Sequence, residues 1–144
     1  MLNKAILMGR LTRDPEFRRT QNNTAVVSFT LAMDRDRKGP NGERQTDFID
    51  CVAWGLQAEF VNQWFTKGML AIVIGRIQSR NWEDKNGNKR VSVEVHAGEV
   101  LFGETKAARQ RAAGAGGEAG GYTPPPPGDG DWSELPDEGD IPFA

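Results

Sequence analysis

The sequence predicts an all-β domain that contains one helix and ends in a disordered tail. Short runs rich in β-branched and aromatic residues recur along most of the chain, which is typical of strands. One stretch between these runs changes to helical spacing. Beyond residue 111 the composition changes to glycine, proline and acidic residues, which is typical of a flexible segment.

Three strands are predicted before the helix. Residues 4–11 form the first, and Asp14-Pro15 ends it because proline cannot donate a ladder hydrogen bond. Residues 25–33 form the second strand. A charged loop over 34–46 then leads into the third strand, residues 46–54.

The helix is predicted from apolar residues at helical spacing, and it is the only helix that we expect. These residues are Leu56, Phe60, Val61, Trp64 and Phe65. Gly68 follows them as a C-terminal stop.

Two or three strands follow the helix. Residues 69–80 form one, and the hairpin signal Asn86-Gly87 joins it to residues 91–97. Residues 100–102 are expected to add a short last strand. This element order is that of an OB-fold, a five-stranded Greek-key barrel with a helix between its third and fourth strands, which binds oligonucleotides. Other small barrels share most of the same order.

Charge separates the chain into two parts. Residues 1–111 contain all 18 Lys and Arg and 13 of the 20 Asp and Glu, a net charge of +5. Residues 112–144 contain seven acidic residues and no basic one, a net charge of −7. A basic body joined to an acidic tail suggests a polyanionic partner such as nucleic acid.

Three regions are therefore expected: a binding domain over 1–105, a disordered Gly/Pro-rich linker over 106–136 and an acidic tip over 137–144. The tip combines acidic and apolar residues, namely Asp137, Glu138, Asp140, Ile141, Pro142 and Phe143. Apolar residues at the end of a segment that cannot fold are explained if they insert into a partner protein. A solvated acidic tail with incidental apolar residues explains the pattern equally well.

Composition also bears on the compartment. The single cysteine, Cys51, permits no intrachain disulfide and fits a reducing compartment. No apolar run approaches the roughly 20 residues of a membrane span, and the N-terminus lacks a long apolar signal region. We expect a cytoplasmic protein without membrane contact.

Catalysis is not expected. The only histidine, His96, lies within a strand, where a structural or surface role is far more common than general-base chemistry. No Cys/His cluster suits zinc, and no Gly-rich loop ends in Lys-Ser or Lys-Thr to cradle phosphates. The sequence therefore predicts no catalytic residue, no metal and no cofactor.

The third strand is predicted to present two aromatic side chains outward. Successive side chains of a strand point to opposite faces. One face carries Phe48, Val52 and Trp54. The other carries Ile49, Cys51 and Ala53, which suit a barrel interior.

The fourth strand and its extension place cationic and aromatic groups on one face. The groups on this face occupy alternate positions of the strand: Arg76, Gln78, Arg80 and Trp82. Rings that stack bases beside cations that follow phosphates are what sequence-independent single-strand binding requires. In the 34–46 loop, Arg35, Arg37 and Lys38 are candidates for phosphate contact, although a solvated loop explains them nearly as well.

The remaining aromatic residues are assigned mainly to the core. We expect Trp64, Phe65, Phe29 and Phe102 to be buried. An interface between subunits would also explain Phe48 and Trp54.

Four segments together resemble the bacterial single-stranded DNA-binding protein family. They are residues 4–16, 27–32, 47–54 and 75–82. The ending Asp140-Ile141-Pro142-Phe143 resembles the family's partner-binding tip. The resemblance covers residues 1–105 and the last eight. It implies an OB-fold homotetramer, associated with the nucleoid, that wraps single-stranded DNA and recruits replication, recombination and repair proteins through its tips.

The resemblance also implies roles for individual residues. Phe48, Trp54 and Trp82 match the family's base-stacking positions. Arg80 and Lys67 match basic contact positions, and Asn3 and Lys4 match the N-terminal contact.

Three departures from the family pattern stand out. Arg37 occupies a loop position where the family often has a fourth aromatic residue. Asp50 lies on the DNA-facing parity, where it would repel phosphate unless Arg or Lys pairs with it. Ala144 follows the phenylalanine at which the family ends, and partner pockets in the family engage the carboxylate of that phenylalanine.

Two other functions remain open from the sequence. One is an OB-fold assembly subunit whose aromatic face binds protein. The other is a single-stranded RNA binder.

Overall fold

Six strands and two helices follow one another in residues 1–114, the part of the chain that the computed structural model describes. The strands are β1 (Ala5–Leu11), β2 (Glu16–Arg19), β3 (Ala25–Lys38), β4 (Arg44–Trp54), β5 (Leu70–Glu83) and β6 (Lys89–Phe102). The helices are α1 (Leu56–Trp64) and α2 (Lys106–Gly114).

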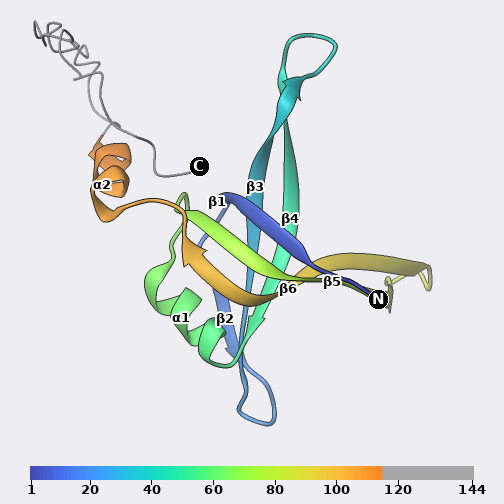
Figure 1. Ribbon diagram of the computed structural model, residues 1–144. Helices are drawn as coiled ribbons and strands as arrows, with labels where there is room; N and C mark the ends of the chain where they lie inside the picture. Colours follow the sequence, from blue (N-terminus) through green and yellow to red (C-terminus); the bar gives the residue numbers. More distant parts are fainter. Residues whose placement is uncertain (115–144) are drawn as a thin grey trace, which may run out of the picture.

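Five of the strands close into a barrel. They pair in the order β1-β5-β6-β4-β3, and β1 also pairs with β3 through Arg10↔Ala32 and Leu11↔Leu31, which closes the sheet on itself. The β4–β6 pairing is parallel and the others are antiparallel. With α1 between β4 and β5 (Figure 1), this confirms the predicted OB-fold.

The core follows the predicted alternation. Ile49 packs against it, and Cys51 and Ala53 lie within it beside β3 residues such as Phe29. Helix α1 contributes Ala58 and Val61, both fully buried, and Phe65 just beyond its end is 2% exposed.

Two long hairpins extend beyond the barrel (Figure 1). One joins β3 to β4 and includes the charged residues predicted as a loop. The other joins β5 to β6, and its residues 76–94 are called the arm below. A bulge between Ile74 and Gly75 separates the arm from the barrel part of β5. At this bulge a Cβ on residue 75 would collide with the His96 carbonyl, so glycine is required there.

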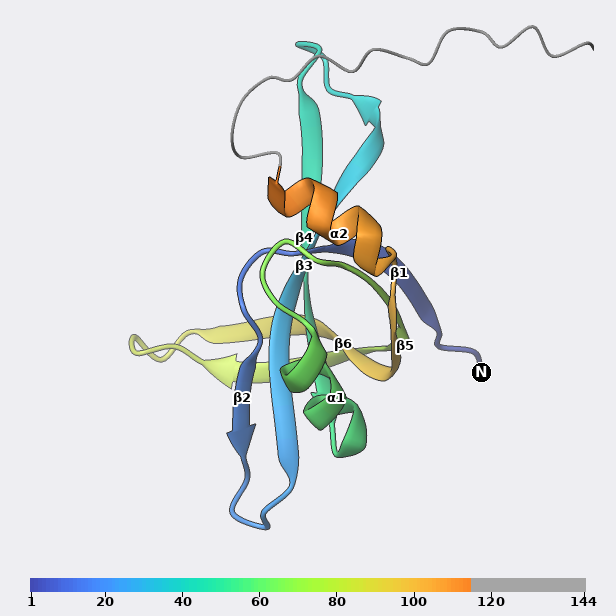
Figure 2. The same ribbon diagram turned by 90° about the vertical axis from the view of Figure 1, so that its left-hand side faces the viewer.

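Some predicted boundaries change. Strand β2, which pairs with β3 beside the barrel (Figure 2), was not predicted because Asp14-Pro15 indicated only a break. Residues 100–102 belong to β6 rather than to a separate strand, because their pairing with β5 continues past the bulge.

The predicted linker is wrong at its beginning. Residues 106–114 form α2, so α1 is not the only helix. Strong helix formers explain it, because the segment reads Lys-Ala-Ala-Arg-Gln-Arg-Ala-Ala-Gly. The rest of the linker and the acidic tip lie outside the described residues.

The Cys51 thiol is expected to resist alkylation in the folded protein. Cys51 is 1% exposed, and burial together with the nearby Asp50 charge raises its pKa to about 12. Because the thiolate is the nucleophile, iodoacetamide at about pH 8 should label the native protein far more slowly than the urea-unfolded protein. Equal labelling rates would contradict this burial.

Candidate nucleic-acid interface

The outer face of β4 presents two exposed rings, as predicted. Phe48 is 65% exposed and Trp54 is 45% exposed. The strand beside them carries small residues on the same face, because Ala32 pairs with Phe48 and Ser28 pairs with Val52. The small Ala32 leaves the Phe48 ring open for stacking, whereas the strand partner of Trp54 is the buried Val26.

The arm has the predicted alternation of cationic and aromatic groups. All β5 residues from Arg76 to Glu83 are exposed, and Trp82 is 45% exposed. Across the strands, Arg80 pairs with Ser92 and Trp82 pairs with Arg90. The β6 strand therefore adds a further cation beside Trp82.

The tip of the arm is held by Asp84. Its carboxylate accepts hydrogen bonds from the backbone N–H groups of Asn86 and Asn88, both at 2.9 Å, and it pairs with Arg90 at 3.3 Å. These bonds lower the pKa of Asp84, and the hydrogen bond from the Asn88 backbone has the largest effect. The turn fixes the hairpin register on which the position of Trp82 depends.

His96 joins the β4 face to the arm. It pairs with Val52 of β4 and Arg76 of β5, and its ring is stacked on Trp54 with centroids 6.5 Å apart. Its Nε2 lies 3.0 Å from Glu94 Oε1. The sequence predicted a structural or surface role for His96 but not its contact with Trp54, because the parallel pairing that brings the two rings together has no local sequence signal.

Two hollows flank Trp54 along this junction. One of about 340 Å³ is lined by Arg76 and His96. The other, of about 520 Å³, is lined by Arg18, Arg80 and Glu94 among others. Because Val52 pairs with His96 and His96 pairs with Arg76, the alternate residues of β4 and of the arm lie on one side of the sheet. This surface is called the outer face below, and it carries Phe48, Trp54, Arg76, Arg80 and Trp82.

Asp50 is paired on the outer face by a hydroxyl instead of a cation. Thr30 Oγ1 donates to Asp50 Oδ1 at 2.7 Å. Arg13 and Arg80 line the same hollow as Asp50. Glu94 lines this hollow too, so two cations face two carboxylates there and the charge of Asp50 is balanced.

The candidate cations of the β3–β4 hairpin differ in availability. Arg35 donates two hydrogen bonds to Asp47, at 2.9 and 2.7 Å. This contact is the main reason that the pKa of Asp47 is lowered. Arg37 and Lys38 are exposed and form no ion pair within residues 1–114. Arg35 is thus already paired with a carboxylate, whereas within the same residues Arg37 and Lys38 are not.

Arg37→Ala should therefore weaken oligo-dT binding more than Arg35→Ala. Each phosphate contact that is lost should flatten the log–log salt slope by about 0.7. Both variants lower the net charge by one. Arg35→Ala removes a cation that is paired with Asp47, whereas Arg37→Ala removes one that has no ion pair within residues 1–114. Titrations at several salt concentrations measure both effects. Unchanged slopes for both would place this hairpin off the path of the nucleic acid.

A match to the family described as "Single-strand binding protein family" covers residues 2–103. The chain belongs to this family. Single-stranded DNA-binding protein A of Bacillus subtilis is 48% identical over 122 residues, which are 85% of this chain and 67% of that protein. The single-stranded DNA-binding protein of Halalkalibacterium halodurans is 38% identical, over 99% of this chain and the full length of that protein. Single-stranded DNA-binding protein 1 of Staphylococcus aureus is 50% identical over 106 residues, 74% of this chain and 68% of that protein.

Asn3 and Lys4, which resemblance to the single-strand binding protein family predicts as DNA contacts, have different surroundings. The Asn3 side chain donates to the Ile77 carbonyl at 2.8 Å and accepts from its N–H at 2.9 Å. It therefore tethers the N-terminus to the arm. Lys4 is exposed and stays a predicted contact.

Lys67 lies in the turn between α1 and β5. Its backbone N–H donates to Asp14 Oδ1 at 2.8 Å, which fixes the turn. Lys67 lines a hollow together with Arg10 and Arg109. The structure thus groups Lys67 with other cations in a hollow that Phe48, Trp54 and Trp82 do not line.

The aromatic residues assigned to the core are partly corrected. Phe29 and Phe65 are buried as predicted, at 1% and 2% exposed. Trp64 is 52% exposed, because α1 ends at this residue and the extended backbone of Phe65 directs the next ring into the core instead. Phe102 is 40% exposed, although one ring face stacks on Phe65 at 4.8 Å.

Within residues 1–114, neither helix is long and apolar enough to cross a membrane. The same stretch contains no cluster of three or more His, Cys, Asp or Glu that suits a metal ion.

Proposed function

We propose that this protein binds single-stranded DNA without sequence preference. Bases stack on Phe48, Trp54 and Trp82, while Arg76 and Arg80 follow the phosphates. The observation that carries the proposal is the outer face, on which strand register places exposed rings and guanidinium groups on the same side of the sheet. The names of the three relatives, all single-stranded DNA-binding proteins, support the same function.

A fluorescence titration with oligo-dT tests this proposal. Stacking on Trp54 and Trp82 should quench tryptophan emission at stoichiometric DNA, and the affinity should fall steeply with salt. A matched RNA oligomer is the second arm. Tighter binding to the RNA would favour an RNA binder, and no quenching with either oligomer would favour a protein-binding role for the aromatic face.

The same proposal includes a homotetramer. Its support is an apolar surface on the outside of the barrel, where Ile6 pairs with Ile74, Met8 pairs with Ile72, and Ile72 pairs with Leu101. Ile6 is 67% exposed and Met8 is 54% exposed. Contiguous exposed apolar surface of this kind marks an interaction site.

Met8→Glu should therefore reduce the molar mass of the protein in solution. A carboxylate in an apolar interface would be desolvated without a partner. Light scattering measures the mass, and Leu56→Glu on α1 is the matched control, since Leu56 is 83% exposed away from this surface. An unchanged mass for Met8→Glu would remove this face from the assembly.

We further propose that the acidic tip recruits replication, recombination and repair proteins. The support is its composition, in which Ile141 and Phe143 follow acidic residues. Deleting residues 137–144 should abolish binding to a purified repair protein and leave oligo-dT binding intact. Equal loss of both would assign the tip to the DNA site.

A further inference from the structure

A hollow of about 360 Å³ lies where β1, the turn after α1 and helix α2 meet. It is called the α2 pocket below. Three cationic side chains line it: Arg10 of β1, Lys67 of the turn and Arg109 of α2. Glu104 is the only carboxylate among its described lining residues. The excess of positive charge makes the pocket suitable for an anion.

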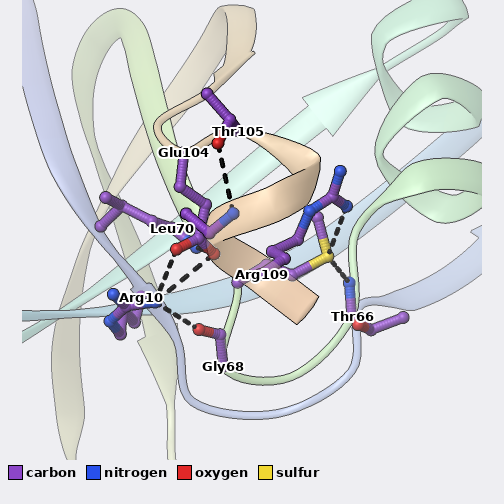
Figure 3. A network of polar contacts seen from close by, with 9 residues as sticks. Arg10, Thr66, Gly68, Leu70, Glu104, Thr105 and Arg109 are labelled. Carbon is purple, nitrogen blue, oxygen red and sulfur yellow. Dashed lines mark hydrogen bonds and ion pairs between the residues drawn. The ribbon is translucent and has the colours of Figure 1, made fainter. Parts of the chain in front are cut away.

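The one carboxylate is already engaged (Figure 3). Glu104 pairs with Arg10 at 3.3 Å and accepts the Leu70 N–H at 3.1 Å. Arg10 also donates to the Gly68 carbonyl at 2.9 Å. These bonds hold Arg10 in place and leave Glu104 with little capacity for the other two cations.

Arg109 has only weak partners. Its Nη1 lies 3.5 Å from the Met69 sulfur, a weak acceptor, and its guanidinium lies over the Phe102 ring at 5.2 Å. Its Nε is buried and has no hydrogen-bond partner among the described residues. The Nε itself is closed to a ligand, but Arg109 as a whole is only half-buried and lines the pocket, so a ligand with several acceptor oxygens can approach its guanidinium there.

The pocket is close to the outer face by strand register. Arg10 pairs with Ala32, and Ala32 pairs with Phe48. Directly paired residues share a face, so Arg10 and Phe48 both point outward in one row. Two interstrand spacings separate them by roughly 10 Å. The backbone of a strand whose base stacks on Phe48 can reach the pocket.

We propose that the α2 pocket holds a backbone phosphate of bound single-stranded DNA, so that α2 extends the binding surface beyond the barrel. Arg109 and Lys67 contact the phosphate, and Glu104 keeps Arg10 oriented toward it. This inference rests on the proposed stacking of a base on Phe48.

Charge-matched variants of α2 test the inference. Arg109→Gln should weaken oligo-dT binding about three- to tenfold and flatten the salt slope by about 0.7. Arg111→Gln removes the same charge from an exposed position on the same helix and should change affinity less than about twofold. Arg109→Lys should recover part of the loss. Circular dichroism confirms that α2 remains folded in each variant.

Equal effects of Arg109→Gln and Arg111→Gln would overturn the proposed phosphate site, because binding would then respond to the net charge of α2 and not to the position of Arg109. The separate variant Phe48→Ala distinguishes a failure of the pocket inference from a failure of the proposed function. If Phe48→Ala weakens binding and Arg109→Gln does not, the pocket inference fails and the proposed function stands. If neither weakens binding, the proposed DNA path itself fails.

The Arg109 Nε–H signal in NMR spectra distinguishes the sources of phosphate. Stoichiometric oligo-dT should shift it, because the DNA delivers the phosphate at high local concentration. Inorganic phosphate at matched ionic strength and the same molar amount should not. A shift with inorganic phosphate and none with DNA would assign the pocket to a free anion and overturn the proposal.

Discussion

Replacing Trp54 and Trp82 together by alanine is expected to weaken oligo-dT binding by roughly 30-fold to 25,000-fold, since each base–aromatic stack contributes about 1–3 kcal/mol. Both rings are half-exposed. Trp54 shares a hollow with His96 and Arg80, and Trp82 follows Arg80 on the same side of the arm. Neither contributes to the buried core, so the free energy of unfolding should change little. Anisotropy titrations with labelled oligo-dT measure the affinity.

Trp64→Ala is the control for this double variant. Trp64 has a similar exposure, 52%, but lies on α1 outside the outer face. Its loss should leave the affinity unchanged. If Trp64→Ala weakens binding as much as loss of Trp54 and Trp82, the nucleic acid follows α1 and the outer face is misassigned.

Phe65→Ala should destabilise the barrel by about 3–5 kcal/mol, the range for truncating a buried aromatic residue. Phe65 is 2% exposed. Its ring stacks on Phe102 at 4.8 Å and meets the edge of Phe60 at 5.8 Å. The variant should leave a cavity where the end of α1 meets the barrel. Urea unfolding at equilibrium measures the loss.

Phe48→Ala is the matched control for stability. It removes the same side chain from a position that is 65% exposed. Surface changes of this kind usually alter stability by less than about 0.5 kcal/mol. The two variants should therefore separate cleanly, with Phe65→Ala affecting folding and Phe48→Ala affecting DNA binding. Similar losses of stability would mean that Phe48 has a structural role in a larger assembly.

Local sequence patterns predicted the parts of the site that depend on one strand. The period of two in β4 placed Phe48 and Trp54 outward because the alternate residues are small and apolar. The same reasoning placed Trp82 on the arm with Arg80. Helical spacing was less informative for Trp64, since it identifies a helix but not which of two adjacent aromatic residues points inward.

The parts that depend on pairing between distant segments were not predictable. His96 reaches Trp54 through a parallel pairing between β4 and β6, and no local signal sets that register. Helix α2 was missed because it lacks an apolar stripe, although its Ala and Arg content favours a helix. The position of Arg109 depends partly on Met69, which is far away in sequence.

The bulge at Gly75 has an evolutionary consequence. On one side of it, β5 contributes Ala71 and Val73 to the core; on the other side, every β5 residue is exposed. A change in the arm therefore alters contacts with a ligand without removing a core contact. Affinity and site size can drift under selection while the barrel keeps its stability, so relatives are expected to diverge faster in the arm than in the strand that feeds it.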